Sequence, residues 1–284
     1  MEHDFRGAIC VATYSRADDL DRCIANIVHS RQGRKIPLIV VHQRGFESVS
    51  QVIAKWESEI QVLVQSETQG RSALENINLN SLLGREVAFT WLQANWCLGI
   101  EDDVQISLDA IDFVVEMYKR HSGNPFFRGV NLGSKLKFDE SKNGFYSLVR
   151  FGIHGQASMI TKRTWRHFNV KKLRKKSNVS GLDAMMEHYV KTGFMCTPRN
   201  SRYLDNGWNG THSSPDPNDE HYVRIRESYF DGRTANPGRY ELRKFDSPWR
   251  FDSRPFSLFQ IIPVLVMNKT RHLRYLLKKR SKSN

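Results

Sequence analysis

Three consecutive acids interrupt the mainly apolar stretch 97–106, in which Glu101, Asp102 and Asp103 directly follow Ile100. The apolar residues suit a strand covered on both faces, whereas three carboxylates are costly to bury without a cation or several donors. We therefore expect the acids to lie at the carboxyl edge of a sheet, where open α/β sheets bind ligands. Clustered carboxylate oxygens suit a hard cation such as Mg2+ or Mn2+, which indicates a metal that holds a diphosphate. Taken alone, the triplet also fits a solvated turn with a helix-capping acid.

Apolar runs and helical stripes alternate at short spacing before the acids. Strands are expected at residues 8–13, 36–41 and 60–64, and helices follow each of them. Ser15 and Asp18 have the spacing of a capping box for the first of these helices. Strands and helices in this alternation are typical of a parallel, doubly wound sheet.

The pattern changes after the acids. Ser107 is the expected N-cap of a helix, and residues 126–130 form the next expected strand. The polar residues 139–144 indicate a hairpin turn between strands at 136–138 and 145–151. We therefore expect a mixed, mainly parallel sheet flanked by helices.

Composition sets the class of the chain. It has 284 residues, of which 39% are hydrophobic, so it can build a sizeable core. No run of about 18 apolar residues and no N-terminal secretory pattern is seen, which leads us to expect a cytoplasmic protein. The four cysteines are scattered and are read as reduced core residues. The net charge of +13 favours an acidic partner or surface.

Other polar residues mark possible ligand contacts. Thr13 and Arg16 stand at the corner between the first strand and its helix, which is a plausible anion site or an ordinary corner. Asp183 stands in the first turn of a later helix, where it could do chemistry or simply complement the helix dipole. His212 ends a polar, glycine-containing loop and is either a metal ligand or an exposed loop histidine.

In this order, the segments resemble the GT-A glycosyltransferases that use nucleotide sugars, particularly relatives of N-acetylglucosaminyltransferase I. Residues 13–16 resemble the family's nucleotide-binding opening, and Glu101-Asp102-Asp103 matches the E-D-D form of its metal motif. Residues 152–165 resemble its acceptor segment, 181–185 its W-D-D-W-M segment, and the stretch to His212 its closing loop. The resemblance covers about residues 8–212 and implies the GT-A fold.

The resemblance also implies roles for individual residues. Asp103 would bind Mn2+ or Mg2+ directly, and His212 would be a further metal ligand. The implied donor-binding residues are Thr13, Arg16, Gln43, Arg71, Glu101 and Asp102. The implied acceptor-binding residues are His154, Gly155 and Trp208. Asp183 would be the general base that deprotonates the acceptor hydroxyl, so that direct displacement inverts the anomeric centre.

The implied activity is transfer of a hexosyl or N-acetylhexosaminyl group from a nucleotide sugar, with a UDP-sugar favoured, to a glycan or lipid-linked glycan. The transferase domain would span residues 1–218, with a nucleotide-binding half at about 1–107 and an acceptor half at about 108–218. Residues 219–284 would form a C-terminal extension.

The extension ends in an apolar segment, 256–267, followed by a basic one, 271–282. This pair fits a peripheral attachment to an anionic membrane, at the inner face, and fits equally a helix packed on the domain with a solvated basic end. A second basic cluster lies at residues 171–176.

Two other functions are compatible with parts of the sequence. A nucleotidyltransferase acting on sugar phosphates also joins a parallel sheet to a carboxylate-bound metal, but it would carry a glycine-rich basic loop that residues 13–16 lack. A non-catalytic nucleic-acid-binding protein would use the basic clusters to hold phosphates. No nucleic-acid motif is recognised, so no nucleic-acid partner is expected.

Overall fold

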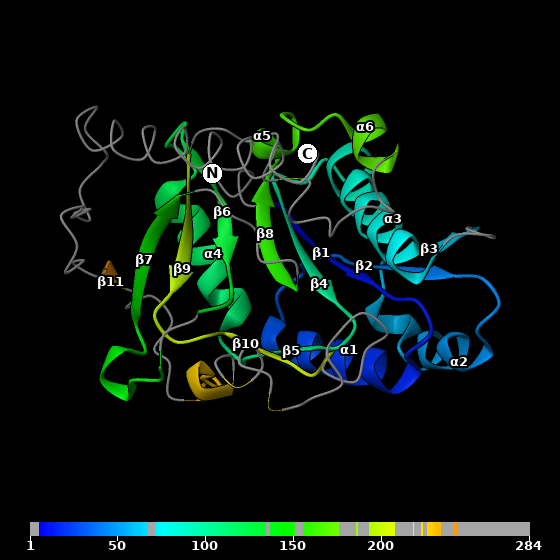
Figure 1. The fold of residues 1–284 in the computed structure, drawn as a ribbon, viewed down its shortest axis with the longest axis horizontal. Helices are drawn as coiled ribbons and strands as arrows, with labels where there is room; N and C mark the ends of the chain where they lie inside the picture. The colour runs from blue at the N-terminus through cyan, green and yellow to red at the C-terminus, as the bar shows by residue number, and fades with distance from the viewer. Residues whose placement is uncertain are drawn as a thin grey trace, which may run out of the picture.

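A computed structural model describes residues 6–67, 72–134, 137–150, 156–175, 186, 193–207, 218, 223, 226–233 and 241–242. Its centre is a nine-stranded sheet with the order β11-β7-β9-β6-β8-β4-β1-β2-β3 (Figure 1). These strands are β1 Gly7–Ala12, β2 Leu38–Gln43, β3 Val62–Ser66, β4 Trp96–Glu101, β6 Phe127–Asn131, β7 Phe145–Arg150, β8 Ala157–Thr161, β9 Phe194–Pro198 and β11 Glu241–Leu242. A separate antiparallel pair joins β5 Val104–Ile106 to β10 Tyr203–Asp205.

The sheet is mixed and mainly parallel, which confirms the predicted class. Strands β3, β2, β1, β4, β6 and β9 run in one direction, and β8, β7 and β11 run in the other. The antiparallel strands all come after the acids in the chain, as expected. Strand β11 belongs to the predicted C-terminal extension and pairs with β7.

Helices cover both faces of the sheet. On one face lie α1 Ala17–Arg31, α2 Glu47–Lys55 and α4 Ala110–His121, and on the other lie α3 Ala73–Glu86 and α6 Val170–Lys175. The shorter helical segments are η2 Glu57–Glu59, the π-helical η3 Val87–Trp91, η4 Glu140–Lys142 and α5 Lys162–Trp165. Central strand residues are buried on both faces, because alternate side chains enter one core or the other. Within the described residues, no helix is long and apolar enough to cross a bilayer.

Three local predictions were wrong. The first helix begins after Arg16 without a side-chain cap, so Ser15 and Asp18 form no capping box there. Asp109, not Ser107, precedes α4, and the Ser107 hydroxyl instead donates to the Asp109 carboxylate at 2.7 Å. Residues 137–138 form no strand, and β7 pairs with β9 and β11 instead of closing a hairpin. Long-range pairing outweighed the local turn pattern.

An aromatic cluster surrounds His121 at the end of α4. The imidazole centroid lies 5.7 Å from the rings of Phe127 and Phe194, and Nε2 lies 3.1 Å from the Tyr146 hydroxyl. Burial, reinforced by the charge of Arg120, lowers the pKa of His121 to about 4. The neutral ring is therefore the form that the folded protein accommodates.

The stability contributed by neutral His121 should be present above pH 6.5 and be lost as the pH falls towards 4. This depressed pKa predicts a loss of about 2 kcal/mol in the free energy of unfolding between pH 7 and pH 5. Urea unfolding of His121→Phe should show a correspondingly weaker pH dependence. Equal slopes in the wild-type protein and His121→Phe would contradict the assignment.

Candidate functional site

The acids lie where the chain changes direction across the sheet. From β1 the chain proceeds to β2 and β3 on one side, and α3 then returns it to β4 on the other side of β1. The carboxyl ends of β1 and β4 are therefore neighbours, with Ala12 opposite Glu101 in register. Ligands of open α/β sheets bind in the crevice at such a switch point. The predicted position of the acids at this edge is confirmed.

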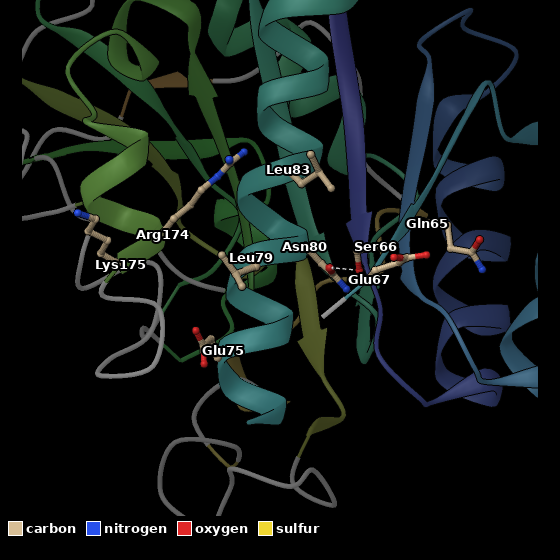
Figure 2. Close-up of a pocket in the computed structure, with 9 residues that line it drawn as sticks. All are labelled: Gln65, Ser66, Glu67, Glu75, Leu79, Asn80, Leu83, Arg174 and Lys175. Carbon is tan, nitrogen blue, oxygen red and sulfur yellow. Dashed lines mark hydrogen bonds between the residues drawn. The ribbon is translucent and has the colours of Figure 1, made fainter. Parts of the chain in front are cut away.

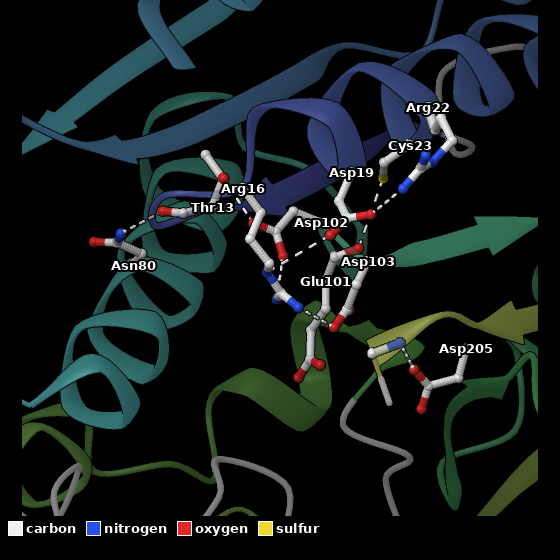
Figure 3. A network of polar contacts seen from close by, with 11 residues as sticks. Thr13, Arg16, Asp19, Arg22, Cys23, Asn80, Glu101, Asp102, Asp103 and Asp205 are labelled. Atoms are coloured by element: carbon white, nitrogen blue, oxygen red, sulfur yellow. Dashed lines mark hydrogen bonds and ion pairs between the residues drawn. The ribbon is translucent and has the colours of Figure 1, made fainter. Parts of the chain in front are cut away.

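Thr13 and Arg16 hold two of the acids from the first corner. The Thr13 hydroxyl donates to Asp102 at 2.7 Å. The Arg16 guanidinium donates through Nη2 to Asp102 and through Nη1 to Asp103, each at 2.5 Å (Figure 3). Asp102 is fully buried, so these charge-assisted bonds replace water that it has lost. The corner is thus part of the acid site.

A glycine brings a fourth acid to the same place. Strand β10 pairs with β5 so that Asp205 lies opposite Val104, one residue beyond Asp103. The Gly207 N–H donates to Asp205 at 2.7 Å. A Cβ atom on Gly207 would lie 2.4 Å from Asp103 Oδ2 and 2.9 Å from Asp205 Oδ1. Only a residue without a side chain permits this close approach of the loop to both carboxylates.

A buried carboxylate oxygen in the cluster lacks a partner among the described residues. Asp103 Oδ2 accepts from Arg16, but Asp103 Oδ1 accepts no hydrogen bond from the described part of the chain. A buried acceptor left in this state costs on the order of 1–3 kcal/mol, and more for a charged group. An added cation or donor at this oxygen would recover that free energy.

Burial and mutual repulsion disfavour the ionised acids. Burial, followed by the charges of neighbouring carboxylates, raises the pKa of Glu101. Burial also raises the pKa of Asp103, although the charge of Arg16 opposes the shift. Burial alone would lower the pKa of Arg16, but the charges of Asp102 and Asp103 outweigh it and raise that pKa. Arg16 pairs with Asp102 and Asp103, while Glu101 and Asp205 add further negative charge beside Asp103, so the site attracts a further cation.

A second layer of polar side chains fixes the Thr13 corner. Asn80 of α3 donates through Nδ2 to the Thr13 carbonyl at 3.0 Å. Its Oδ1 atom accepts from Ser66 at the end of β3 at 2.7 Å. Neither residue was predicted as part of the site. The buried asparagines at 76, 78 and 80 in α3 were the available signal, because an amide inside a helix needs a partner when it is buried.

Asn80 also lines a groove of about 590 Å³ between β3, α3 and α6 (Figure 2). Ser66 and Glu67 line its β3 side, and Arg174 and Lys175 line its α6 side. The groove and the acids are therefore connected through one side chain, Asn80.

Gln43 ends β2 on the same carboxyl edge. Its Oε1 atom is buried and accepts no hydrogen bond. The preceding residue, His42, is also buried with an unpartnered Nδ1, and burial lowers its pKa. This end of β2 therefore offers polar atoms that the fold itself does not satisfy.

The structure brings together Thr13, Arg16, Glu101, Asp102 and Asp103, and it adds Asp205 and Gly207, which were not predicted as site residues. Both stand in a loop recognised from sequence as polar and glycine-rich, but its pairing with β5 could not be foreseen. The remaining predicted residues lie outside the described part of the chain: Arg71, His154, Gly155, Asp183, Trp208 and His212.

The sequence matches no family model and no curated protein. Among solved structures, one that the chain resembles is the mannosyltransferase PcManGT from Pyrobaculum calidifontis in complex with GDP-Man and Mn2+. That match has 16% identity and a TM-score of 0.46, and covers 68% of this chain and 56% of that one. S. aureus TarS 1-349 matches with 9% identity and a TM-score of 0.42, over 78% of this chain and 63% of that one.

The galactosyltransferase LgtC, in complex with donor and acceptor sugar analogs, matches with 11% identity and a TM-score of 0.40, over 67% of this chain and 72% of that one. The chain thus spans 56% and 63% of the length of the first two structures. The chemistry of the site has to be argued from its own residues.

Gly207→Ala tests the close packing around the two carboxylates. The added methyl group should displace Asp103 or Asp205 and lower the free energy of unfolding by about 1–3 kcal/mol, as overpacking does. The control is Gly123→Ala, because nothing lies within 4 Å of the Cβ position there. Chemical denaturation should show a change within about 0.5 kcal/mol for the control. Equal stability of the two variants would mean that the loop at Gly207 does not approach the acids.

Proposed function

We propose that the chain is a metal-dependent glycosyltransferase that moves a sugar from a nucleotide-sugar donor, with UDP-sugars favoured, to a glycan or lipid-linked glycan. The observation that carries the proposal is the unpartnered, buried Oδ1 of Asp103 at the switch point of the sheet. It belongs to a carboxylate whose other oxygen is already fixed by Arg16. A carboxylate with one bonded and one unbonded oxygen can bind a cation through the second oxygen, and the cation can in turn bind an anionic ligand.

The residues fit a divalent cation that is completed by its substrate. Asp103 and Asp205 would hold Mn2+ or Mg2+, with His212 as a further ligand implied by the resemblance. In the described residues, no three His, Cys, Asp or Glu side chains converge so that they could hold a metal ion by themselves. The proposed site therefore needs ligands from the substrate, since Mg2+ beside phosphates is bound through one or two carboxylates, waters and substrate oxygens. When bound, the ion would neutralise charge on the departing nucleoside diphosphate.

The described residues would bind and orient the donor. Thr13 and Arg16 fix the buried Asp102, which would order the site, while Glu101 would contact the nucleoside. Gln43 Oε1 would accept a hydrogen bond from an N–H of the base, and the N3–H of uracil is such a donor. Arg71 would contribute a positive charge near the diphosphate. Thr13, Gln43 and Glu101 stand at the carboxyl ends of neighbouring strands, which supports the roles proposed for this edge.

Transfer itself would use residues that the resemblance places in the acceptor half. Asp183 would take the proton from the acceptor hydroxyl as its oxygen attacks the anomeric carbon. The bond from that carbon to the diphosphate oxygen breaks in the same step, so the configuration inverts. His154, Gly155 and Trp208 would hold the acceptor. A carboxylate in hydrogen-bond reach of the hydroxyl is the requirement for this role.

A thermal-shift panel with Asp103→Asn tests the proposal. The wild-type protein should be stabilised by UDP and UDP-sugars only when Mn2+ is present, because a ligand that binds only the native state raises its apparent stability. Ligand at about 100 times its dissociation constant contributes roughly 2.7 kcal/mol. Asp103→Asn should lose this shift, and it should release no UDP from UDP-sugars with Mn2+.

Asp18→Asn is the matched control, because Asp18 is an exposed acid on α1 outside the hydrogen-bond network of the site. It should keep the wild-type shift. Absence of any nucleotide-dependent shift in the wild-type protein, or an undiminished shift in Asp103→Asn, would refute the proposed site. A shift with GDP but not UDP would retain the enzyme class and change the base.

A further inference from the structure

A basic face lies at the edge of the large sheet opposite the acids. It comprises residues 86–93, at the end of α3 and through η3, together with 162–166 at α5 and 170–175 at α6. Figure 1 shows α5 and α6 at the top of the molecule and β5 and β10 at the bottom. Strand β4, which connects the two edges, has six residues and so spans roughly 20 Å. The η3 and α5 part of the basic face is therefore separate from the acid site, whereas Arg174 and Lys175 of α6 also line the groove beside Asn80.

Contacts between the three segments make this face continuous. Lys162 Nζ at the start of α5 donates to Gln93 Oε1 at 2.6 Å. Arg174 of α6 forms an ion pair with Glu86 at the end of α3. The turn around η3 thus lies between the two basic helices and contacts both.

Trp91 projects from this turn. Its side chain is 80% exposed, whereas Phe89, two residues earlier, is buried and stacks on Trp165 with ring centroids 5.4 Å apart. The packing of Phe89 on Trp165 therefore fixes the turn to the domain, while the Trp91 side chain remains in solvent. Single exposed apolar side chains are ordinary on protein surfaces. Trp91 differs from an ordinary exposed apolar side chain because the segments that contact its turn carry many charges.

Most of the surrounding charge is positive, although Glu67 and Glu75 line the groove beside Arg174 and Lys175. Residues 162–175 contain seven lysines and arginines and no acid. The one acid of the basic face, Glu86, is already paired with Arg174. The exposed cations are Arg163, Arg166, Lys171, Lys172, Arg174 and Lys175. Repulsion among them is unfavourable in the free protein, and an anionic surface would relieve it.

We propose that the basic face docks onto an anionic membrane surface, with Trp91 entering the headgroup region. Lysine and arginine clusters are attracted to anionic lipids, and the amphipathic indole ring favours the membrane interface. Nucleic acid would use the same charges, but binding single strands relies on aromatic platforms along a basic groove, whereas Trp91 stands alone on a turn. The proposal concerns described residues and is independent of the C-terminal segment 256–284 and of the sugar-transfer site.

Sedimentation of the full chain with vesicles tests the proposal. Phosphatidylcholine vesicles containing phosphatidylglycerol should retain the protein at low salt, and pure phosphatidylcholine vesicles should not. Lys171→Gln/Lys172→Gln should lower partitioning roughly thirty-fold, at about fivefold for each basic residue. Trp91→Ala should lower it several-fold with little salt dependence, because the loss is not electrostatic.

The matched control is Lys137→Gln/Lys142→Gln. It removes the same charge from the segment around η4, outside the basic face, and should retain wild-type partitioning. Trp91, Lys171, Lys172 and Lys137 are exposed, and Lys142 is half-buried over the Phe145 ring. Circular dichroism would confirm that each variant folds. Equal partitioning of both double variants would overturn the proposal and assign binding to net charge or to another segment. Binding to RNA that falls in Lys171→Gln/Lys172→Gln while vesicle binding is unchanged would also overturn it, in favour of nucleic acid.

Discussion

Repulsion among four carboxylates at one sheet edge is the constraint that the surrounding structure has to satisfy. A continuous series of hydrogen bonds meets it: Ser66 donates to Asn80, Asn80 to Thr13, and Thr13 to Asp102. These bonds join the carboxyl ends of β3, β1 and β4 to the middle of α3. Arg16 then neutralises part of the charge. The acids therefore remain close together because residues distant in sequence hold them.

The parallel register of β1 and β4 explains why this arrangement forms at all. Pairing of Ala12 with Glu101 places the loop between β1 and α1 beside the acids. Thr13 and Arg16, which lie directly after β1, can therefore contact them. The β5–β10 pair then brings Asp205 and Gly207 from about a hundred residues later. Among the described residues, Asp103 Oδ1 still lacks a hydrogen-bond partner. This missing partner is the reason for proposing a metal site at this edge of the sheet.

Sequence patterns predicted the parts of the fold that depend on local alternation of apolar residues. Uninterrupted apolar runs have to be buried, and this predicted the strands at 8–13 and 36–41. The same argument predicted that the later strand ends at Glu101. The hairpin at 139–144 was wrong because β7 finds better partners in β9 and β11, which no local signal encodes. Asp205 was overlooked for the same reason, since its place beside Asp103 depends on a pairing across the chain.

The opposite positions of the acids and Trp91 bear on which acceptors the proposed transferase could use. If the molecule rests on lipid through η3 and its basic neighbours, the acids lie about 20 Å from the headgroups, the length of β4. A sugar attached directly to a lipid phosphate would be too near the bilayer to reach it. The acceptor would have to be a growing saccharide long enough to extend into solution and around the domain, or one that diffuses freely.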